Sequence, residues 1–184
     1  MIKIGVVGCG AIGSSLARKI VSGFSGQARL AAVYDIDRQK AHKLARSLGR
    51  PGLSVSDLAA LIKRSDLVIE AASARVSWDI CRRTLEAGRD CLVLSVGGIV
   101  SRLDRLSRLG KAGQGRVYIP SGAVSGIDAL AAARQGKITK VILTTRKHPV
   151  SFRGVKFVED KKLDLDSIRK DTVLFDGTAE QAVK

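Results

Sequence analysis

Short apolar runs alternate with longer segments of helical periodicity over the first 120 residues. The apolar runs predict strands at Lys3–Val7, Leu30–Tyr34, Leu67–Ala71, Cys91–Ser95 and Arg116–Ile119. The segments between them predict helices at Ala11–Ser22, Gln39–Leu48, Ser56–Arg64, Val76–Ala87 and Ser101–Ala112. The strand candidates are nearly continuous in Val, Ile and Leu, which is typical of a parallel sheet covered by helices on both faces. The pattern therefore predicts an α/β fold with a doubly wound parallel sheet.

The pattern changes after about Gly136. A helix is predicted at Val124–Ala133 and a strand of a different kind at Ile138–Thr145, followed by a charged stretch over Arg146–Asp171. Thr178 and Gln181 have the spacing of a capping box, which predicts a final helix. We expect residues 1–120 to form the α/β domain and residues 121–184 to begin a second, α+β domain. Because this helix starts so near Lys184, we expect that more protein follows.

Composition places the chain among ordinary globular proteins. The 184 residues are 45% hydrophobic and 27% charged, which argues against disorder. No run approaches the roughly 20 apolar residues of a membrane helix, and the N-terminus lacks the basic and apolar regions of a signal peptide. Three cysteines, Cys9, Cys81 and Cys91, form no CxxC pair, so we expect reduced thiols in a cytoplasmic protein and no metal site.

The net charge is +15, from 32 basic and 17 acidic residues. Such an excess suits nucleic-acid binders and also proteins that handle anionic small molecules. Here the charge is spread along the chain without a basic tail, and aromatic residues make up only 4%. Few side chains could therefore stack on bases. The composition favours a small anionic ligand over nucleic acid.

The segment Gly8-Cys-Gly10-Ala-Ile-Gly13 lies between the first predicted strand and the first predicted helix, where a dinucleotide-binding loop belongs. Gly8 would permit the tight turn, Gly10 the approach of a pyrophosphate, and Gly13 close packing of helix on strand. Ala11 and Ile12 would offer backbone N–H groups to the anionic oxygens. This loop makes the predicted domain a Rossmann-type dinucleotide-binding domain.

Asp35 ends the second predicted strand, about 20 residues after Gly13, where an acidic residue binds the adenosine ribose hydroxyls. A carboxylate repels a 2′-phosphate, so Asp35 favours NAD over NADP. Arg38 lies nearby and could accommodate that phosphate, so NADP remains open. The alternative role for Asp35 is that of a turn or N-cap carboxylate.

The other strand ends also carry small and polar residues. Ala72 and Ser73 follow the third strand and Ser95 ends the fourth, and ligands of open α/β sheets bind at this edge. Each could also belong to an ordinary strand-to-helix turn. Glu70 is expected to give polar support rather than to act as a catalytic base. The Gly/Ser-rich turn that begins at Pro120 could line the nicotinamide and substrate end of the crevice.

Several segments together resemble the archaeal and bacterial L-aspartate dehydrogenase family. They are the Gly8–Gly13 loop, Glu70-Ala-Ala-Ser73, Leu94-Ser-Val-Gly97, Ile119-Pro-Ser-Gly-Ala-Val-Ser-Gly-Ile-Asp128, Leu143-Thr-Thr-Arg-Lys147 and Leu174-Phe-Asp-Gly-Thr-Ala-Glu-Gln-Ala182. The resemblance implies an NAD(P)-dependent oxidoreductase that interconverts L-aspartate with iminoaspartate or oxaloacetate, often feeding NAD biosynthesis. It also implies a homodimer with a mixed α/β second domain, and a cofactor contact at Ala123.

Aspartate carries two carboxylates, so a basic crevice would attract it, and Arg146 and Lys147 are candidate donors to them. Ser121 and Gly122 are further candidates for substrate binding. A solvated strand end is the other interpretation of Arg146 and Lys147.

The resemblance also implies segments beyond Lys184: an Asn-rich turn at the nicotinamide, and a strand whose His is the proposed acid/base. His148 does not align with that His, so we expect no catalytic residue within these 184 residues. Two alternatives stay open beside an aspartate dehydrogenase. One is a homoserine-dehydrogenase-like amino-acid dehydrogenase, and the other is a truncated, non-catalytic NAD-binding protein.

Overall fold

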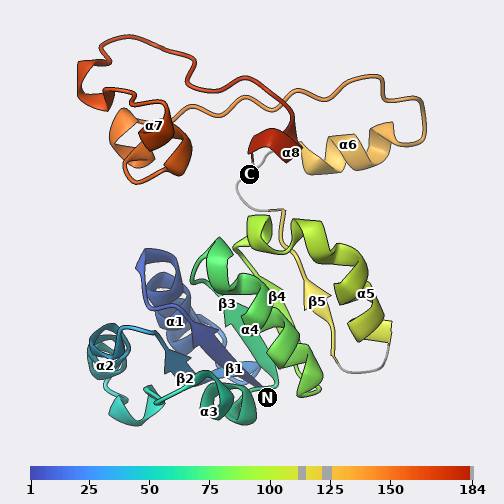
Figure 1. Cartoon of the computed structure of the whole chain (residues 1–184). Helices are drawn as coiled ribbons and strands as arrows, with labels where there is room; N and C mark the ends of the chain where they lie inside the picture. The colour runs from blue at the N-terminus through green and yellow to red at the C-terminus, as the bar shows by residue number, and fades with distance from the viewer. Residues whose placement is uncertain (112–114, 122–125, 183–184) are drawn as a thin grey trace. The chain divides into compact units, whose positions relative to one another are not determined.

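The structure is a computed structural model that describes residues 1–111, 115–121 and 126–182 (Figure 1). The chain divides into two units, Met1–Val124 and Ser125–Lys184. Within the described ranges, no helix combines the length and the apolar content needed to cross a membrane.

A five-stranded parallel sheet forms the centre of the first unit (Figure 1). Its strands are β1 (Ile2–Val7), β2 (Ala28–Tyr34), β3 (Leu67–Glu70), β4 (Asp90–Val93) and β5 (Val117–Tyr118). The spatial order is β2-β1-β3-β4-β5, and every neighbouring pair is parallel. The predicted fold class is confirmed for this unit. Because the chain order reverses between β1 and β3, the loops after these strands flank a topological switch point, where open α/β sheets bind ligands.

Helices cover both faces of the sheet, which explains the nearly continuous apolar runs. They are α1 (Ala11–Gly23), α2 (Arg38–Ser47), α3 (Leu58–Arg64), α4 (Ala74–Glu86) and α5 (Leu103–Lys111). On one face, α1 and α2 pack Ile20 and Leu44 against Val6 and Leu30. Other apolar clusters join α3 and α4 to the strands from the second face, and α5 packs with α4 and β4. The short 3-10 helices of this unit are η1 (Pro51–Leu53), η2 (Val96–Gly98) and η3 (Val100–Arg102).

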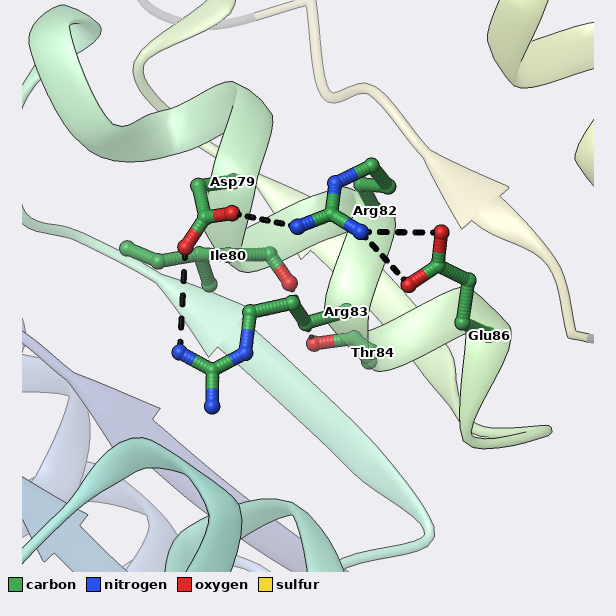
Figure 2. Close-up of polar contacts among 6 residues, drawn as sticks. All are labelled: Asp79, Ile80, Arg82, Arg83, Thr84 and Glu86. Atoms are coloured by element: carbon green, nitrogen blue, oxygen red, sulfur yellow. Dashed lines mark hydrogen bonds and ion pairs between the residues drawn. The ribbon is translucent and has the colours of Figure 1, made fainter.

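Helix α4 separates an apolar inner face from a charged outer face (Figure 2). On the outer face, Arg82 donates to Asp79 at 2.7 Å and to Glu86 at 2.7 Å, and Arg83 lies 3.7 Å from Asp79. Such exposed pairs stabilise a fold only slightly. Inside, the buried Thr84 hydroxyl donates to the Ile80 carbonyl at 2.7 Å. The N-terminus of α4 lies at the carboxyl end of β3 because only three residues connect the two elements.

The second unit contains α6 (Ile127–Ala133), α7 (Lys156–Asp160) and α8 (Ala179–Ala182), with 3-10 turns η4 (Pro149–Phe152) and η5 (Leu165–Ser167). The strand expected over Ile138–Thr145 does not form, since residues 137–148 have no regular secondary structure. Val141, Ile142 and Leu143 are exposed by 57%, 73% and 64%, and no strand among the described residues of this unit lies beside them. The capping box is confirmed: the Thr178 N–H donates to Gln181 and the Gln181 N–H to the Thr178 hydroxyl.

Candidate cofactor-binding site

The loop after β1 is held by the strands on either side of it. Gly8 has a φ of +94°, which glycine adopts without steric cost. Its N–H donates to the Tyr34 carbonyl at the end of β2, at 2.8 Å. On the other side, a Cβ at this position would overlap the Ala71 carbonyl oxygen, which follows β3. Only glycine therefore lets the loop cross between β2 and β3 without moving either strand end.

Gly10 and Gly13 serve different purposes. Gly10 is the N-cap of α1, and a Cβ added there would meet no atom within 4 Å. At Gly13 a Cβ would overlap the Gly8 carbonyl oxygen, so glycine is needed for the helix to approach the loop. The Ser14 hydroxyl donates to the Cys9 carbonyl at 2.9 Å and fixes the loop from the helix. Ser14 was not among the predicted site residues, although its place in the first helical turn was a usable signal.

The start of α1 has the character of an anion cradle. Ala11 and Ile12 are exposed, and the first turn carries no acidic residue. The first N–H groups of a helix lack intrahelical partners, and the helix dipole adds a partial positive charge there. The open space at Gly10 lets a ligand approach this backbone. A diphosphate fits such a cradle.

Asp35 follows β2 directly and is half-buried. One carboxylate oxygen accepts the Cys9 N–H at 2.7 Å, and the other accepts the Asp37 N–H at 2.9 Å. Asp35 therefore lies against the glycine-rich loop and also shapes the turn into α2, which Asp37 caps. Of the two roles considered from the sequence, the turn carboxylate is present, whereas binding of the ribose hydroxyls stays a prediction.

Cys9 points into the core, where it packs among residues of β1, β2, α1 and α2. Burial, assisted by the negative charge of Asp35, raises the pKa of its thiol to about 12. The thiol is thus neutral near pH 7, and it lines the interior rather than the crevice. Cys81 and Cys91 are likewise buried and free, as predicted.

The ends of β3 and β4 are joined by Glu70, which is fully buried. Its carboxylate accepts the Ala72 N–H at 2.8 Å, the Ser95 N–H at 2.9 Å and the Ser95 hydroxyl at 2.9 Å. Ala72 and Ser73 are exposed, and Ser73 is the N-cap of α4. Ala72, Ser73 and Ser95 thus lie on the same carboxyl edge of the sheet as the glycine-rich loop.

The remaining candidates fall elsewhere. Ser121 is exposed after β5, whereas Gly122 and Ala123 lie outside the described residues. Arg146 and Lys147 are exposed in the second unit, where Arg146 donates to Asp171 at 2.6 Å. His42 is exposed, and His148 caps η4, its Nδ1 accepting the Val150 N–H at 3.4 Å.

The parallel sheet, the switch point and the glycine-rich loop define a Rossmann-like domain, the class of fold that binds dinucleotides. The fold is similar to UDP-N-acetylglucosamine 3-dehydrogenase GnnA from Acidithiobacillus ferrooxidans, with a TM-score of 0.58 at 21% identity, over 73% of this chain and 42% of that chain. It is also similar to myo-inositol dehydrogenase from Lactobacillus casei in complex with NAD(H) and myo-inositol, with a TM-score of 0.56 at 19% identity, over 73% and 41%. At these identities the likeness shows the fold alone.

Sequence comparison gives the family. Residues 8–120 match the NAD binding domain of homoserine dehydrogenase, and residues 128–184 match the C-terminal domain of aspartate dehydrogenase. The whole chain is 41% identical to an L-aspartate dehydrogenase of Methanococcoides burtonii and 40% identical to one of Methanosarcina barkeri, and it spans 68% of the length of each. The chain belongs to the L-aspartate dehydrogenase family, and the resemblance seen in its motifs is confirmed.

Proposed function

We propose that this chain belongs to an enzyme that oxidises L-aspartate to iminoaspartate, which hydrolyses to oxaloacetate, with NAD as hydride acceptor. The observation that carries the proposal is the open backbone at Gly10, at the start of α1, beside the carboxylate of Asp35. Identity of about 40% to L-aspartate dehydrogenases over the whole chain supports the substrate.

The residues of the carboxyl edge take distinct roles in this proposal. The N–H groups of Ala11 and Ile12 bind the diphosphate, and Asp35 accepts the adenosine ribose hydroxyls. Each Asp35 oxygen already accepts one N–H, and a carboxylate oxygen can accept a second donor. Further contacts to the dinucleotide come from Ala72, Ser73, Ser95 and Ala123. When bound, the nicotinamide supplies the hydride chemistry, while the protein orients it and excludes competing reactions.

NAD is favoured over NADP because the Asp35 carboxylate would face a 2′-phosphate. Asp37 caps α2 and is paired with Lys40 at 3.7 Å, so the preference rests on the Asp35 carboxylate. Arg38 at the start of α2 is exposed, and it is the residue that could bind the phosphate if NADP were used.

For the substrate, we propose that Ser121, Gly122, Arg146 and Lys147 contribute to binding the carboxylates of aspartate. The Arg146 guanidinium already engages the carboxylate of Asp171, and both side chains are well exposed, at 81% and 74%. An incoming carboxylate can exchange with such a solvated partner at small cost. We further propose a cytoplasmic homodimer whose product feeds NAD biosynthesis, in line with the family.

Calorimetric titration of the purified chain tests this proposal. We expect NAD⁺ to bind more tightly than NADP⁺, and L-aspartate to bind the NADH-saturated protein more tightly than L-homoserine does. Absence of binding by both dinucleotides would overturn the assignment of the loop. Preference for L-homoserine would instead favour the homoserine-dehydrogenase-like alternative, which shares the match over residues 8–120.

A further inference from the structure

Glu70 is completely buried, and it lies at the carboxyl edge of the sheet, beside the candidate cofactor-binding site. It is 0% exposed and is the last residue of β3. Its partners belong to two loops: Ala72 lies two residues on, before α4, and Ser95 lies at the end of β4. One carboxylate therefore fixes the shape of both loops, and no exposed atom of Glu70 is left to touch a ligand directly.

The hydrogen bonds around Glu70 have the pattern expected of a carboxylate. All three groups that contact it are donors, and two of them are backbone N–H groups, which cannot accept a proton in return. Several donors aimed at one carboxyl group stabilise its charged form. Glu70 is a buried anion.

The position of Glu70 relative to the switch point determines what this anion faces. Doubly wound sheets bind the two halves of a dinucleotide on the two sides of that point. Asp35 follows β2, on one side, and would take the adenosine ribose. Glu70 joins β3 to β4, on the other side, which is the side left for the nicotinamide half. The nicotinamide ring carries a positive charge in NAD⁺ and none in NADH.

We propose that Glu70 is a positioning residue that also discriminates between the two redox forms of the cofactor. It holds the loops after β3 and β4, and its buried charge binds NAD⁺ more tightly than NADH. This inference rests on the proposed function. At an effective dielectric constant of about 20, one charge acting on another within about 12 Å changes an equilibrium about tenfold. A tenfold preference for NAD⁺ lowers the reduction potential of the bound couple by about 30 mV, which favours substrate reduction by bound NADH.

The test compares the dissociation constants of NAD⁺ and NADH for wild type, Glu70→Gln and Glu70→Asp by calorimetry and NADH fluorescence. Glu70→Gln removes the charge at nearly constant size, so NAD⁺ should lose about tenfold more affinity than NADH. Glu70→Asp keeps the charge but shortens the side chain, so both affinities should fall by similar factors. Glu86→Gln on the outer face of α4 is the matched control, and its ratio of dissociation constants should equal that of wild type.

Equal losses for NAD⁺ and NADH in Glu70→Gln would show a purely structural role and overturn the proposal. If Glu70→Gln does not fold, as judged by its thermal transition, Glu70→Met, which is neutral and of similar length, takes its place: NAD⁺ should again lose about tenfold more affinity than NADH, and equal losses would overturn the proposal. Ser95→Ala removes the hydroxyl donor and leaves the carboxylate, so it should shift both affinities together. If wild type binds neither dinucleotide, the proposed function has failed rather than the role of Glu70.

Discussion

Replacing Gly10 by alanine should abolish tight cofactor binding while leaving the fold intact. Gly10 has φ −72° and ψ −164°, which alanine adopts readily, and its Cβ would meet no atom within 4 Å. Alanine is a poorer N-cap than glycine, which destabilises the fold. It also reduces the conformational entropy of the unfolded chain, which stabilises the fold by about 0.4–1 kcal/mol. These effects oppose each other, so the free energy of unfolding should change by less than about 0.5 kcal/mol.

The methyl group would stand where the diphosphate approaches the start of α1. Displacing the anion would weaken one hydrogen bond between a backbone N–H and a charged oxygen, and such a bond contributes about 1.5–3 kcal/mol. The dissociation constant of NAD⁺ should therefore rise about 10- to 100-fold.

Gly8→Ala is the matched control because it adds the same methyl group two residues earlier in the same loop. There the positive φ alone costs about 1–2 kcal/mol, and the Cβ would overlap the Ala71 carbonyl oxygen. Together with the cost of overpacking, the loss in the free energy of unfolding should reach about 3 kcal/mol. Such a loss lowers the melting temperature by about 6–12 °C in a chain of this size.

The assay pairs differential scanning calorimetry with NAD⁺ titration for both variants. Gly10→Ala should melt within about 2 °C of wild type and bind weakly, whereas Gly8→Ala should melt well below it. If Gly10→Ala binds NAD⁺ as wild type does, the cradle at the start of α1 is not the diphosphate site. If Gly10→Ala melts as low as Gly8→Ala, the space around Gly10 is not open.

Two further predictions concern Asp35 and Cys9. Asp35→Ser removes the carboxylate that would repel a 2′-phosphate, so the ratio of NADP⁺ to NAD⁺ dissociation constants, measured by calorimetry, should fall about tenfold; an unchanged ratio would place the adenosine ribose elsewhere. The Cys9 thiol has its pKa raised from 9.0 to about 12, so the unfolded chain loses this proton at lower pH than the folded one. Its contribution to stability is fully present below pH 9.0 and is lost as the pH rises toward about 12. Urea unfolding should therefore show a shallower alkaline loss in Cys9→Ala than in wild type, and identical slopes would contradict the assignment.

The first unit could be predicted in some detail because local pattern and tertiary environment agree there. The strands are nearly continuous apolar runs, and the centres of β1 to β4 are buried between helices, so the pattern indicated strands clearly. For the α-helices and strands, the differences lie at the element ends, whereas the short 3-10 helices η1, η2 and η3 were not predicted. Helix α3 begins at Leu58 rather than Ser56, because the Asp57 side chain accepts the Ala60 N–H at 2.8 Å and sets the N-cap.

The segment Ile138–Thr145 shows where the same reasoning fails. Its β-branched residues fit a strand, yet a strand exists only when another strand satisfies its backbone N–H and carbonyl groups. Strand β5 makes the contrast: it is only two residues long, but Val117 and Tyr118 are paired with Cys91 and Leu92 of β4. The β-propensity of both segments predicted a strand, but only Val117–Tyr118 has a neighbouring strand to pair with and forms one.

Asp35 and Glu70 show why residue type alone does not assign a role in the site. Both are carboxylates that follow or end a strand, and both accept backbone N–H groups of the loops at the sheet edge. Asp35 is half-buried and keeps access to solvent, so it can bind a ligand hydroxyl directly. Glu70 is fully buried, so it can act only by holding its loops and through its charge. Sequence position identified both acids, but the pairing of β1 with β2 and of β3 with β4 determines this difference, because it brings Cys9 to Asp35 and Ser95 to Glu70.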